Sequence, residues 1–123
     1  MPKTIMIVDD ALSIRGLVRM TLENVGYSVI EANHGRDALE KLNAASSVMD
    51  LIILDLYMPE MDGMALIAAL KAESRLRRIP LVVLTKETDP AARRRGQEAG
   101  AKAWVVKPFR PNTILNVVQR IIG

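Results

Sequence analysis

Short apolar runs alternate along the chain with segments in which apolar residues recur every three or four positions. Uninterrupted apolar runs of this length are typical of strands that are buried on both faces, as in a parallel sheet. The runs predict five strands, at residues 5–8, 28–32, 51–54, 81–84 and 103–106.

The segments between these runs have the spacing of amphipathic helices. We expect the first helix to have Ser13 as its N-cap and to end at Gly26. The fourth is expected to follow Asp89 as its cap, with Pro90 as its first residue and Gly100 at its end. Apolar stripes mark the other three, at residues 38–42, 66–70 and 114–122.

This alternation predicts a (βα)5 fold, a doubly wound α/β domain with helices on both faces of a parallel five-stranded sheet. We expect the flavodoxin-like strand order 2-1-3-4-5 and a single domain over residues 1–123. In such sheets ligands lie beyond the carboxyl ends of the strands, near the switch in strand order. Functional residues are therefore expected at those ends.

Composition narrows the class of protein. Half of the 123 residues are hydrophobic and a quarter are charged, so we expect a folded core. The lack of cysteine excludes disulfides and thiolate metal sites. No apolar stretch reaches the roughly 18 residues that span a bilayer, and the N-terminus does not resemble a signal peptide, so we expect a cytoplasmic protein. The net charge of +3 is too small to indicate nucleic-acid binding.

Polar residues follow four of the five predicted strands. Asp9 and Asp10 follow the first, Asp55 the third, Thr85 the fourth and Lys107 the fifth. Three carboxylates brought together repel one another, and a divalent cation removes that cost. Oxygen ligands of this kind suit Mg²⁺, which is often held by one or two carboxylates together with phosphate. A carboxylate nucleophile, a metal ion, a lysine and a hydroxyl together favour phosphoryl transfer.

Four segments carry a resemblance to a known family. They are Ile7-Val8-Asp9-Asp10, residues 54–59 followed by Asp62-Gly63, residues 82–85, and residues 99–109. In this order and at these spacings they resemble the CheY-like receiver domains of bacterial two-component response regulators. The resemblance covers essentially the whole chain.

The resemblance implies a metal site and a phosphoacceptor. Asp55 is similar to the phosphoacceptor of such domains. Asp10 and Asp55 resemble direct ligands of Mg²⁺, for which Mn²⁺ is an alternative, and the backbone carbonyl of Tyr57 resembles a third ligand. Asp9 is expected to act mainly through water. No organic cofactor is implied.

The resemblance also implies a switch. Thr85 looks like the hydroxyl that moves toward the phosphoryl group, and Lys107 looks like its cationic partner. The bond from Lys107 to Pro108 is expected to be cis, as in similar domains. Trp104 occupies the position of the family's switch aromatic, where it is bulkier than the usual Tyr or Phe.

The implied partners are proteins. In similar domains a phosphohistidine on a sensor histidine kinase or a histidine phosphotransfer protein donates the phosphoryl group, and small acyl phosphates are alternative donors. The resemblance implies that the domain catalyses its own phosphorylation and dephosphorylation without being a conventional turnover enzyme. Phosphorylation adds about −1.5 to −2 charges. It is expected to change the face formed by the fourth helix, the fifth strand and the fifth helix, and so the affinity for a downstream protein.

Some positions near the site depart from the commonest family pattern. Lys86 stands where a small residue is usual, and Tyr57 and Glu87 occupy flanking positions that govern loss of the phosphoryl group in similar domains. We therefore expect an altered phosphoryl lifetime. A basic run at residues 93–95 has two interpretations, a solvated helix face or a contact with an acidic partner.

Other classes of protein are alternatives. A degenerate receiver would act as a phosphorylation-independent interaction module, which Lys86 favours and the full acidic set with Lys107 opposes. An aspartate-dependent phosphohydrolase would need a second carboxylate two positions after Asp55, where a tyrosine stands. A flavodoxin-like protein would need a phosphate-binding loop after the first strand, where the two acids would repel the anion. A stand-alone protein is expected, with a fragment of a longer regulator as the alternative.

Overall fold

The computed structural model describes residues 2–45, 49–86 and 90–123. Within these ranges, strands and helices alternate along the chain as expected. The strands are β1 (Thr4–Val8), β2 (Ser28–Ala32), β3 (Leu51–Asp55), β4 (Leu81–Thr85) and β5 (Ala103–Val106). The helices are α1 (Leu12–Glu23), α2 (Gly35–Ala44), α3 (Gly63–Ala72), α4 (Pro90–Glu98) and α5 (Pro111–Ile122).

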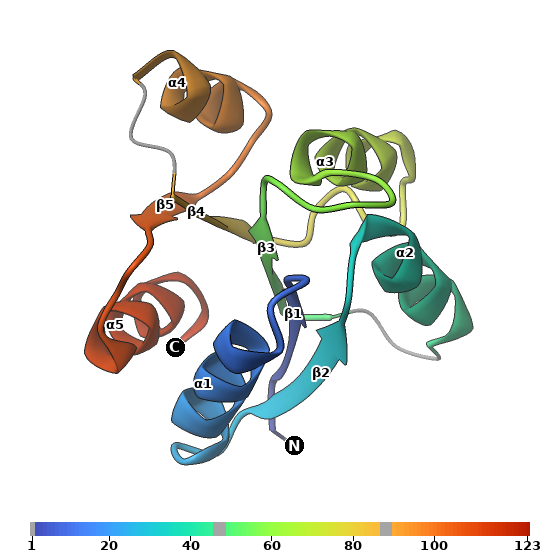
Figure 1. Cartoon of the computed structure of the whole chain (residues 1–123). Coiled ribbons are helices and arrows are strands. Elements are labelled where there is room, and N and C mark those ends of the chain that lie inside the picture. Colours follow the sequence, from blue (N-terminus) through green and yellow to red (C-terminus); the bar gives the residue numbers. More distant parts are fainter. Residues whose placement is uncertain (1, 46–48, 87–89) are drawn as a thin grey trace.

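The strands form one parallel sheet in the order β2-β1-β3-β4-β5, which confirms the predicted flavodoxin-like topology. Helices α1 and α5 cover one face, and α2 and α3 cover the other, with α4 next to β5 at the edge of the sheet (Figure 1). The order reverses at β1 and β3, so their carboxyl ends flank the crevice in which ligands of such sheets bind.

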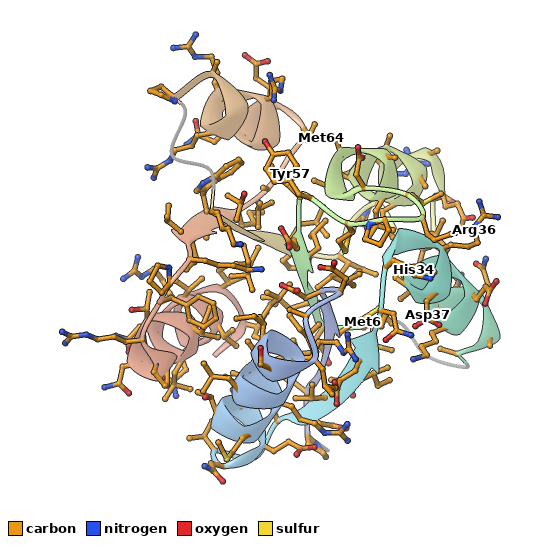
Figure 2. The ribbon with its side chains drawn as sticks, viewed as in Figure 1. Met6, His34, Arg36, Asp37, Tyr57 and Met64 are labelled. Atoms are coloured by element: carbon orange, nitrogen blue, oxygen red, sulfur yellow. The ribbon has the colours of Figure 1, made fainter. Side chains whose placement is uncertain are left out.

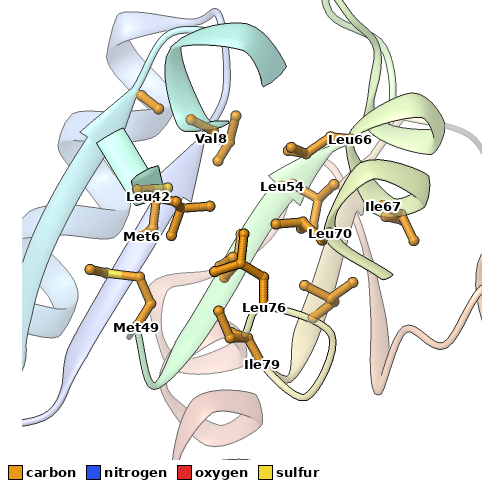
Figure 3. Packing of buried hydrophobic residues seen from close by; sticks show 14 of the residues in the cluster. Met6, Val8, Leu42, Met49, Leu54, Leu66, Ile67, Leu70, Leu76 and Ile79 are labelled. Atoms are coloured by element: carbon orange, nitrogen blue, oxygen red, sulfur yellow. The ribbon is translucent and has the colours of Figure 1, made fainter. Parts of the chain in front are cut away.

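The strands are buried on both faces because each contributes to two core layers. Alternate residues of a strand point to opposite faces, so Met6 and Val8 pack toward α2 and α3, whereas Ile5 and Ile7 pack toward α1 and α5. Figure 3 shows the layer beneath α2 and α3, in which Leu54 of β3 joins Met6 and Val8. This arrangement explains why the strands are apolar throughout instead of alternating with polar residues.

The expected strands at residues 28–32 and 103–106 match β2 and β5, and the other three are one residue longer than expected. Asp55 and Thr85 are thus the last residues of β3 and β4. The expected cap at Ser13 is wrong, because α1 begins at Leu12 and its N-cap residue is Ala11. Pro90 begins α4 as expected, and its expected cap Asp89 lies outside the described residues.

The start of α2 is tied to the loop that follows β3. His34 precedes the helix, and its Nδ1 accepts a hydrogen bond of 3.2 Å from the backbone N–H of Asp37 (Figure 2). Gly35 lies so close to the loop that a Cβ atom there would stand 2.7 Å from the carbonyl oxygen of Met61. Arg36 lies 3.6 Å from the Glu60 carboxylate across the same contact. These contacts hold the loop that follows β3 against the start of α2. The same loop flanks the crevice.

No helix in the described parts of the chain is both long enough and apolar enough to cross a bilayer.

Candidate functional site

The carboxyl ends of β1, β3 and β5 bring three charged side chains together. Asp9 follows β1, Asp55 ends β3 and Lys107 follows β5. The Lys107 Nζ atom donates hydrogen bonds of 2.7 Å to Asp9 Oδ2 and 3.1 Å to Asp55 Oδ2. With Asp10 the two aspartates form a group whose carboxylate oxygens lie within 4.8 Å of one another. The sequence therefore predicted correctly that these strand ends meet.

Each carboxylate of the group has a different environment. Asp9 is completely buried, and its second oxygen, Oδ1, accepts a hydrogen bond of 2.8 Å from the backbone N–H of Ala11. Asp55 is 7% exposed, and its Oδ1 accepts one of 3.1 Å from the backbone N–H of Tyr57. Asp10 is exposed, and within the described ranges its carboxylate makes no hydrogen bond or ion pair. Asp10 is thus the carboxylate with its oxygens free for an incoming ligand.

Arg15 holds the turn that carries the two acids, a role that the sequence did not predict. Its side chain is buried against β1, where Nη1 donates a hydrogen bond of 2.7 Å to the Asp9 carbonyl. Its Nε donates one of 3.0 Å to Glu31 on β2. The signal in the sequence was an arginine one turn after Ala11, on the side of the helix that includes Val18.

The charges at the base of the site are unequal, because the ammonium group bonded there, that of Lys107, lies among three carboxylates, while Lys86 lies at the rim. Burial raises the pKa of Asp55, and the nearby Asp9 charge acts in the same direction. Hydrogen bonds from the Tyr57 amide and from Lys107 lower this pKa without offsetting the burial. Burial lowers the pKa of Lys107, but the hydrogen bonds to both carboxylates outweigh it and leave the pKa raised. Lys107 is therefore held as a cation, and a second positive charge would relieve the remaining repulsion.

The donor set fits a hard divalent cation. Three carboxylates within reach of one point, one of them exposed and without a partner among the described residues, are oxygen ligands of the kind that Mg²⁺ binds. The crevice around them has a volume of about 310 Å³, which leaves room for a phosphoryl group. Its lining residues are Asp9, Asp10, Ala11, Asp55, Tyr57, Lys86 and Lys107.

Three other residues singled out from the sequence lie at or near this crevice at different depths. Thr85 is completely buried, and its carbonyl accepts a hydrogen bond of 2.8 Å from the Lys107 backbone N–H. Tyr57 is 54% exposed, and Figure 2 shows its ring pointing away from the end of β3. Lys86 is exposed at the rim. Glu87 lies outside the described residues.

Trp104 lies away from the crevice, on β5 beneath α4. A Cβ atom at Gly96 of α4 would stand 2.3 Å from Cζ3 of the Trp104 ring, so the ring fits against the helix only because residue 96 is glycine. The indole Nε1 is buried and has no hydrogen-bond partner among the described residues. The Lys107–Pro108 bond is cis, as expected.

The start of α3 packs directly beneath the end of β3. The Gly63 N–H donates a hydrogen bond of 2.8 Å to the Leu56 carbonyl. A Cβ atom at residue 63 would stand 2.4 Å from the Asp55 carbonyl oxygen and 2.6 Å from Leu56 Cα. Because both of these atoms belong to the backbone, glycine is required for α3 to approach the strand this closely.

Asp55→Asn is expected to increase the free energy of unfolding at neutral pH when no divalent cation is present. The pKa of Asp55 is raised in the folded state, so its ionised form destabilises the fold at neutral pH. As the pH falls through that raised pKa, Asp55 of the wild type takes up a proton and its destabilising effect disappears. The difference in the free energy of unfolding between the variant and the wild type therefore becomes smaller at lower pH. Lys107 keeps Asp9 as a partner in the variant.

Denaturant titrations between neutral pH and pH 4 measure this difference. Glu40→Gln is the matched control, because Glu40 is exposed on α2 and its replacement removes the same charge. An Asp55→Asn variant less stable than the wild type at neutral pH would contradict the charge balance described above.

Comparisons with known proteins agree with this geometry. The family model of the response regulator receiver domain matches residues 5–119. Chemotaxis protein CheY1 of Helicobacter pylori is 34% identical over 97% of this chain and 96% of its own length. The structure of chemotaxis response regulator CheY4 of Vibrio cholerae has a TM-score of 0.91 at 40% identity, covering 98% of this chain and 99% of that one.

A second similar structure contains a metal ion. It is the receiver domain of the sensor histidine kinase PA1611 of Pseudomonas aeruginosa, with a magnesium ion coordinated in its active site cleft. Its TM-score is 0.88 at 25% identity, covering 100% of this chain and 99% of that one. Receiver domains generally bind Mg²⁺ in an acidic pocket and interact with histidine kinases and downstream targets. The fold, the acidic crevice and these matches together show that the chain belongs to the family of response regulator receiver domains, of the CheY type.

Proposed function

We propose that Asp55 accepts a phosphoryl group from a phosphohistidine of a sensor histidine kinase or a histidine phosphotransfer protein. The observation that carries this proposal is the joining of Asp9 and Asp55 by Lys107, with Asp10 beside them, in a crevice open to solvent. A carboxylate that is hydrogen-bonded to an ammonium group, as Asp55 is to Lys107, is a suitable nucleophile for phosphorus. We also propose a cytoplasmic location for this reaction.

The bonds that change in the transfer are those of Asp55 and the phosphohistidine donor. An oxygen of Asp55 forms a bond to phosphorus as the bond between phosphorus and the histidine nitrogen breaks, and the bonding electron pair remains on the imidazole. Lys107 lies 3.1 Å from Asp55 Oδ2, so its ammonium group can balance the charge that develops on the phosphoryl oxygens. The Tyr57 amide holds the other oxygen of Asp55 and fixes the direction of the carboxylate.

Asp10, Asp55 and the backbone carbonyl of Tyr57 would hold Mg²⁺, with Mn²⁺ as an alternative, and Asp9 would act through water. When bound, the cation supplies positive charge that offsets the repulsion between the acids and the phosphoryl oxygens. Arg15 supports this set by fixing the Asp9 carbonyl, which limits movement of the turn that carries both acids.

The modified domain is proposed to act by binding a downstream protein. A phosphoryl group adds about −1.5 to −2 charges next to Lys107 and near Thr85. The backbone N–H of Lys107 donates a hydrogen bond to the Thr85 carbonyl. A shift of Thr85 toward the phosphoryl group would therefore also move the end of β5. The surface of α4, β5 and α5 would then change its affinity for a partner, with Trp104 between β5 and α4 as a switch residue.

Incubation of the protein with Mg²⁺ and acetyl phosphate tests this function directly. The intact mass is expected to increase by one phosphoryl group in the wild type, and to stay unchanged in Asp55→Asn or when EDTA is present. A wild-type protein that never gains mass, although it is folded and binds Mg²⁺, would instead support the alternative, a degenerate receiver that acts as a phosphorylation-independent interaction module.

The lifetime of the modified form is expected to depend on Lys86 and Tyr57. Both line the crevice next to Asp55, and the Lys86 ammonium group can neutralise a phosphoryl oxygen. Replacing both, by Lys86→Ala and Tyr57→Asn, is expected to speed dephosphorylation about fivefold, which corresponds to about 1 kcal/mol in the barrier. Loss of the phosphoryl mass with time measures the rate. An unchanged rate would exclude both residues from this role.

A further inference from the structure

The positive charge of the protein is concentrated at its carboxyl end. Residues 90–123, which form α4, β5, α5 and their connections, contain seven Lys and Arg residues and one acidic residue, Glu98. Residues 1–89 contain ten Lys and Arg residues and thirteen acidic ones. The formal net charge is therefore +6 for the last 34 residues and −3 for the remainder. Adding residues 86–89 to the carboxyl-terminal segment still leaves it at +5.

A hollow of about 120 Å³ lies within this segment, between α4 and β5. Arg93 and Gln97 of α4 line one side, and Lys102 and Trp104 line the other. Arg93 and Lys102 are exposed, as are the neighbouring residues 94 and 95. We call Arg93, Gln97, Lys102 and Trp104 the basic hollow.

Trp104 forms part of the wall of the basic hollow. The Trp104 ring lies against Gly96, where any larger residue would collide with it, and the indole Nε1 is buried without a partner in the described part of the chain. Two cations and a side-chain amide thus line one small space, with the Trp104 ring as part of its wall.

We propose that the basic hollow binds a carboxylate side chain from an acidic segment of a partner protein. Arginine pairs well with carboxylates because its guanidinium group can donate two parallel hydrogen bonds. Lys102 adds a second charge, and the volume matches one acidic side chain more closely than a large ligand. The proposal rests on the proposed function, because it names the chemistry of the partner for the surface of α4, β5 and α5.

Nucleic acid and anionic membranes fit this surface less well. Single-stranded nucleic acid binds through aromatic platforms as well as cations, and a peripheral membrane helix inserts large apolar side chains. Among the described residues the exposed large hydrophobic side chains are Leu12, Met20, Val25 and Tyr57, and none of them belongs to residues 90–123. In the described part of residues 90–123 the cationic surface therefore has no fully exposed aromatic or large aliphatic side chain on which bases could stack or that could enter a lipid surface.

The single tryptophan of the chain provides a probe inside the basic hollow. Its indole N–H gives one resonance in a nitrogen–proton correlation spectrum, which can be followed as a ligand is added. The probes are a glutamate decapeptide, its glutamine counterpart, an oligothymidylate of matched charge, and vesicles that contain phosphatidylserine. Each is titrated at near-physiological salt into both the unmodified and the phosphorylated protein, because exposed charges are strongly screened at higher salt.

Two charge-reversed double variants distinguish binding at the basic hollow from non-specific electrostatic attraction to the protein as a whole. Arg93→Glu with Lys102→Glu reverses the two cations of the hollow. Arg77→Glu with Arg78→Glu changes the net charge equally at exposed residues between α3 and β4. Circular dichroism and thermal unfolding establish that both variants are folded.

The glutamate peptide is expected to shift the Trp104 indole resonance in at least one of the two forms of the protein. The first variant should bind at least tenfold more weakly, and the second within about twofold of the wild type. Equal weakening in both variants, tighter binding of the oligothymidylate or the vesicles, or no shift with the peptide would overturn the proposal. Formation of the Asp55 adduct is measured separately, so the adduct without peptide binding refutes this inference alone, and peptide binding without the adduct refutes the proposed function.

Discussion

Lys107→Met is expected to lower the free energy of unfolding by about 2 kcal/mol at neutral pH without divalent cations. The substitution leaves Asp9, which is completely buried, and Asp55 without the ammonium group that bridges them. Removing one partner of a fully buried ion pair costs roughly 3–5 kcal/mol. The loss here is expected to be smaller because the crevice is open to water and Asp55 can take up a proton.

Mg²⁺ is expected to recover more stability in Lys107→Met than in the wild type, since the variant has more uncompensated negative charge. Denaturant unfolding with and without Mg²⁺ measures both effects. Lys102→Met is the control, because it removes an exposed lysine five residues earlier and should change stability by no more than about 0.5 kcal/mol. If Lys107→Met and Lys102→Met lost equal amounts of unfolding free energy, the interaction of Lys107 with Asp9 and Asp55 would not contribute to stability.

Gly63→Ala is expected to destabilise the protein by about 3 kcal/mol, at the upper end of the usual cost of overpacking. The added methyl group would lie 2.4 Å from the Asp55 carbonyl oxygen and 2.6 Å from Leu56 Cα. Neither backbone atom can move without shifting the end of β3, and with it the Asp55 side chain. Phosphorylation from acetyl phosphate should therefore be slower than in the wild type even under conditions where the variant is folded.

Gly16→Ala is the matched control for this prediction. Gly16 lies within α1, where a Cβ atom would meet nothing within 4 Å. Alanine there is expected to stabilise the helix by about 0.5–1 kcal/mol and to leave phosphorylation unchanged. If Gly63→Ala were as stable as the wild type and were modified as quickly, the close approach of α3 to Asp55 would have no functional importance.

The positions of the strands could be predicted because burial on both faces leaves a simple pattern. Ile5 and Met6 face opposite core layers, so a buried parallel strand is continuously apolar and ends where a polar residue appears. The same rule located the site, since Asp55 and Lys107 stand at strand ends that a parallel sheet must place on one edge. Local patterns were sufficient for both predictions.

Contacts between distant residues could not be predicted in this way. The turn before α1 is fixed by Asp9, whose carboxylate accepts from the Ala11 amide, and by Arg15, which reaches Glu31 on β2. Ser13 is a residue type that often caps helices, but with these contacts in place α1 begins earlier, at Leu12. The fit of Trp104 against Gly96 is similarly a property of two elements, and neither residue alone indicates it.

The most direct test of the central claim is to locate the phosphoryl group on the chain. Borohydride reduces an aspartyl phosphate to the corresponding alcohol, so the modified residue can be identified by fragmentation of proteolytic peptides. After incubation with acetyl phosphate and Mg²⁺, the reduced residue is predicted to be Asp55 alone. Reduction at Asp9 or Asp10, or no reduced residue in a protein that has gained the phosphoryl mass, would contradict the assignment of Asp55 as the acceptor.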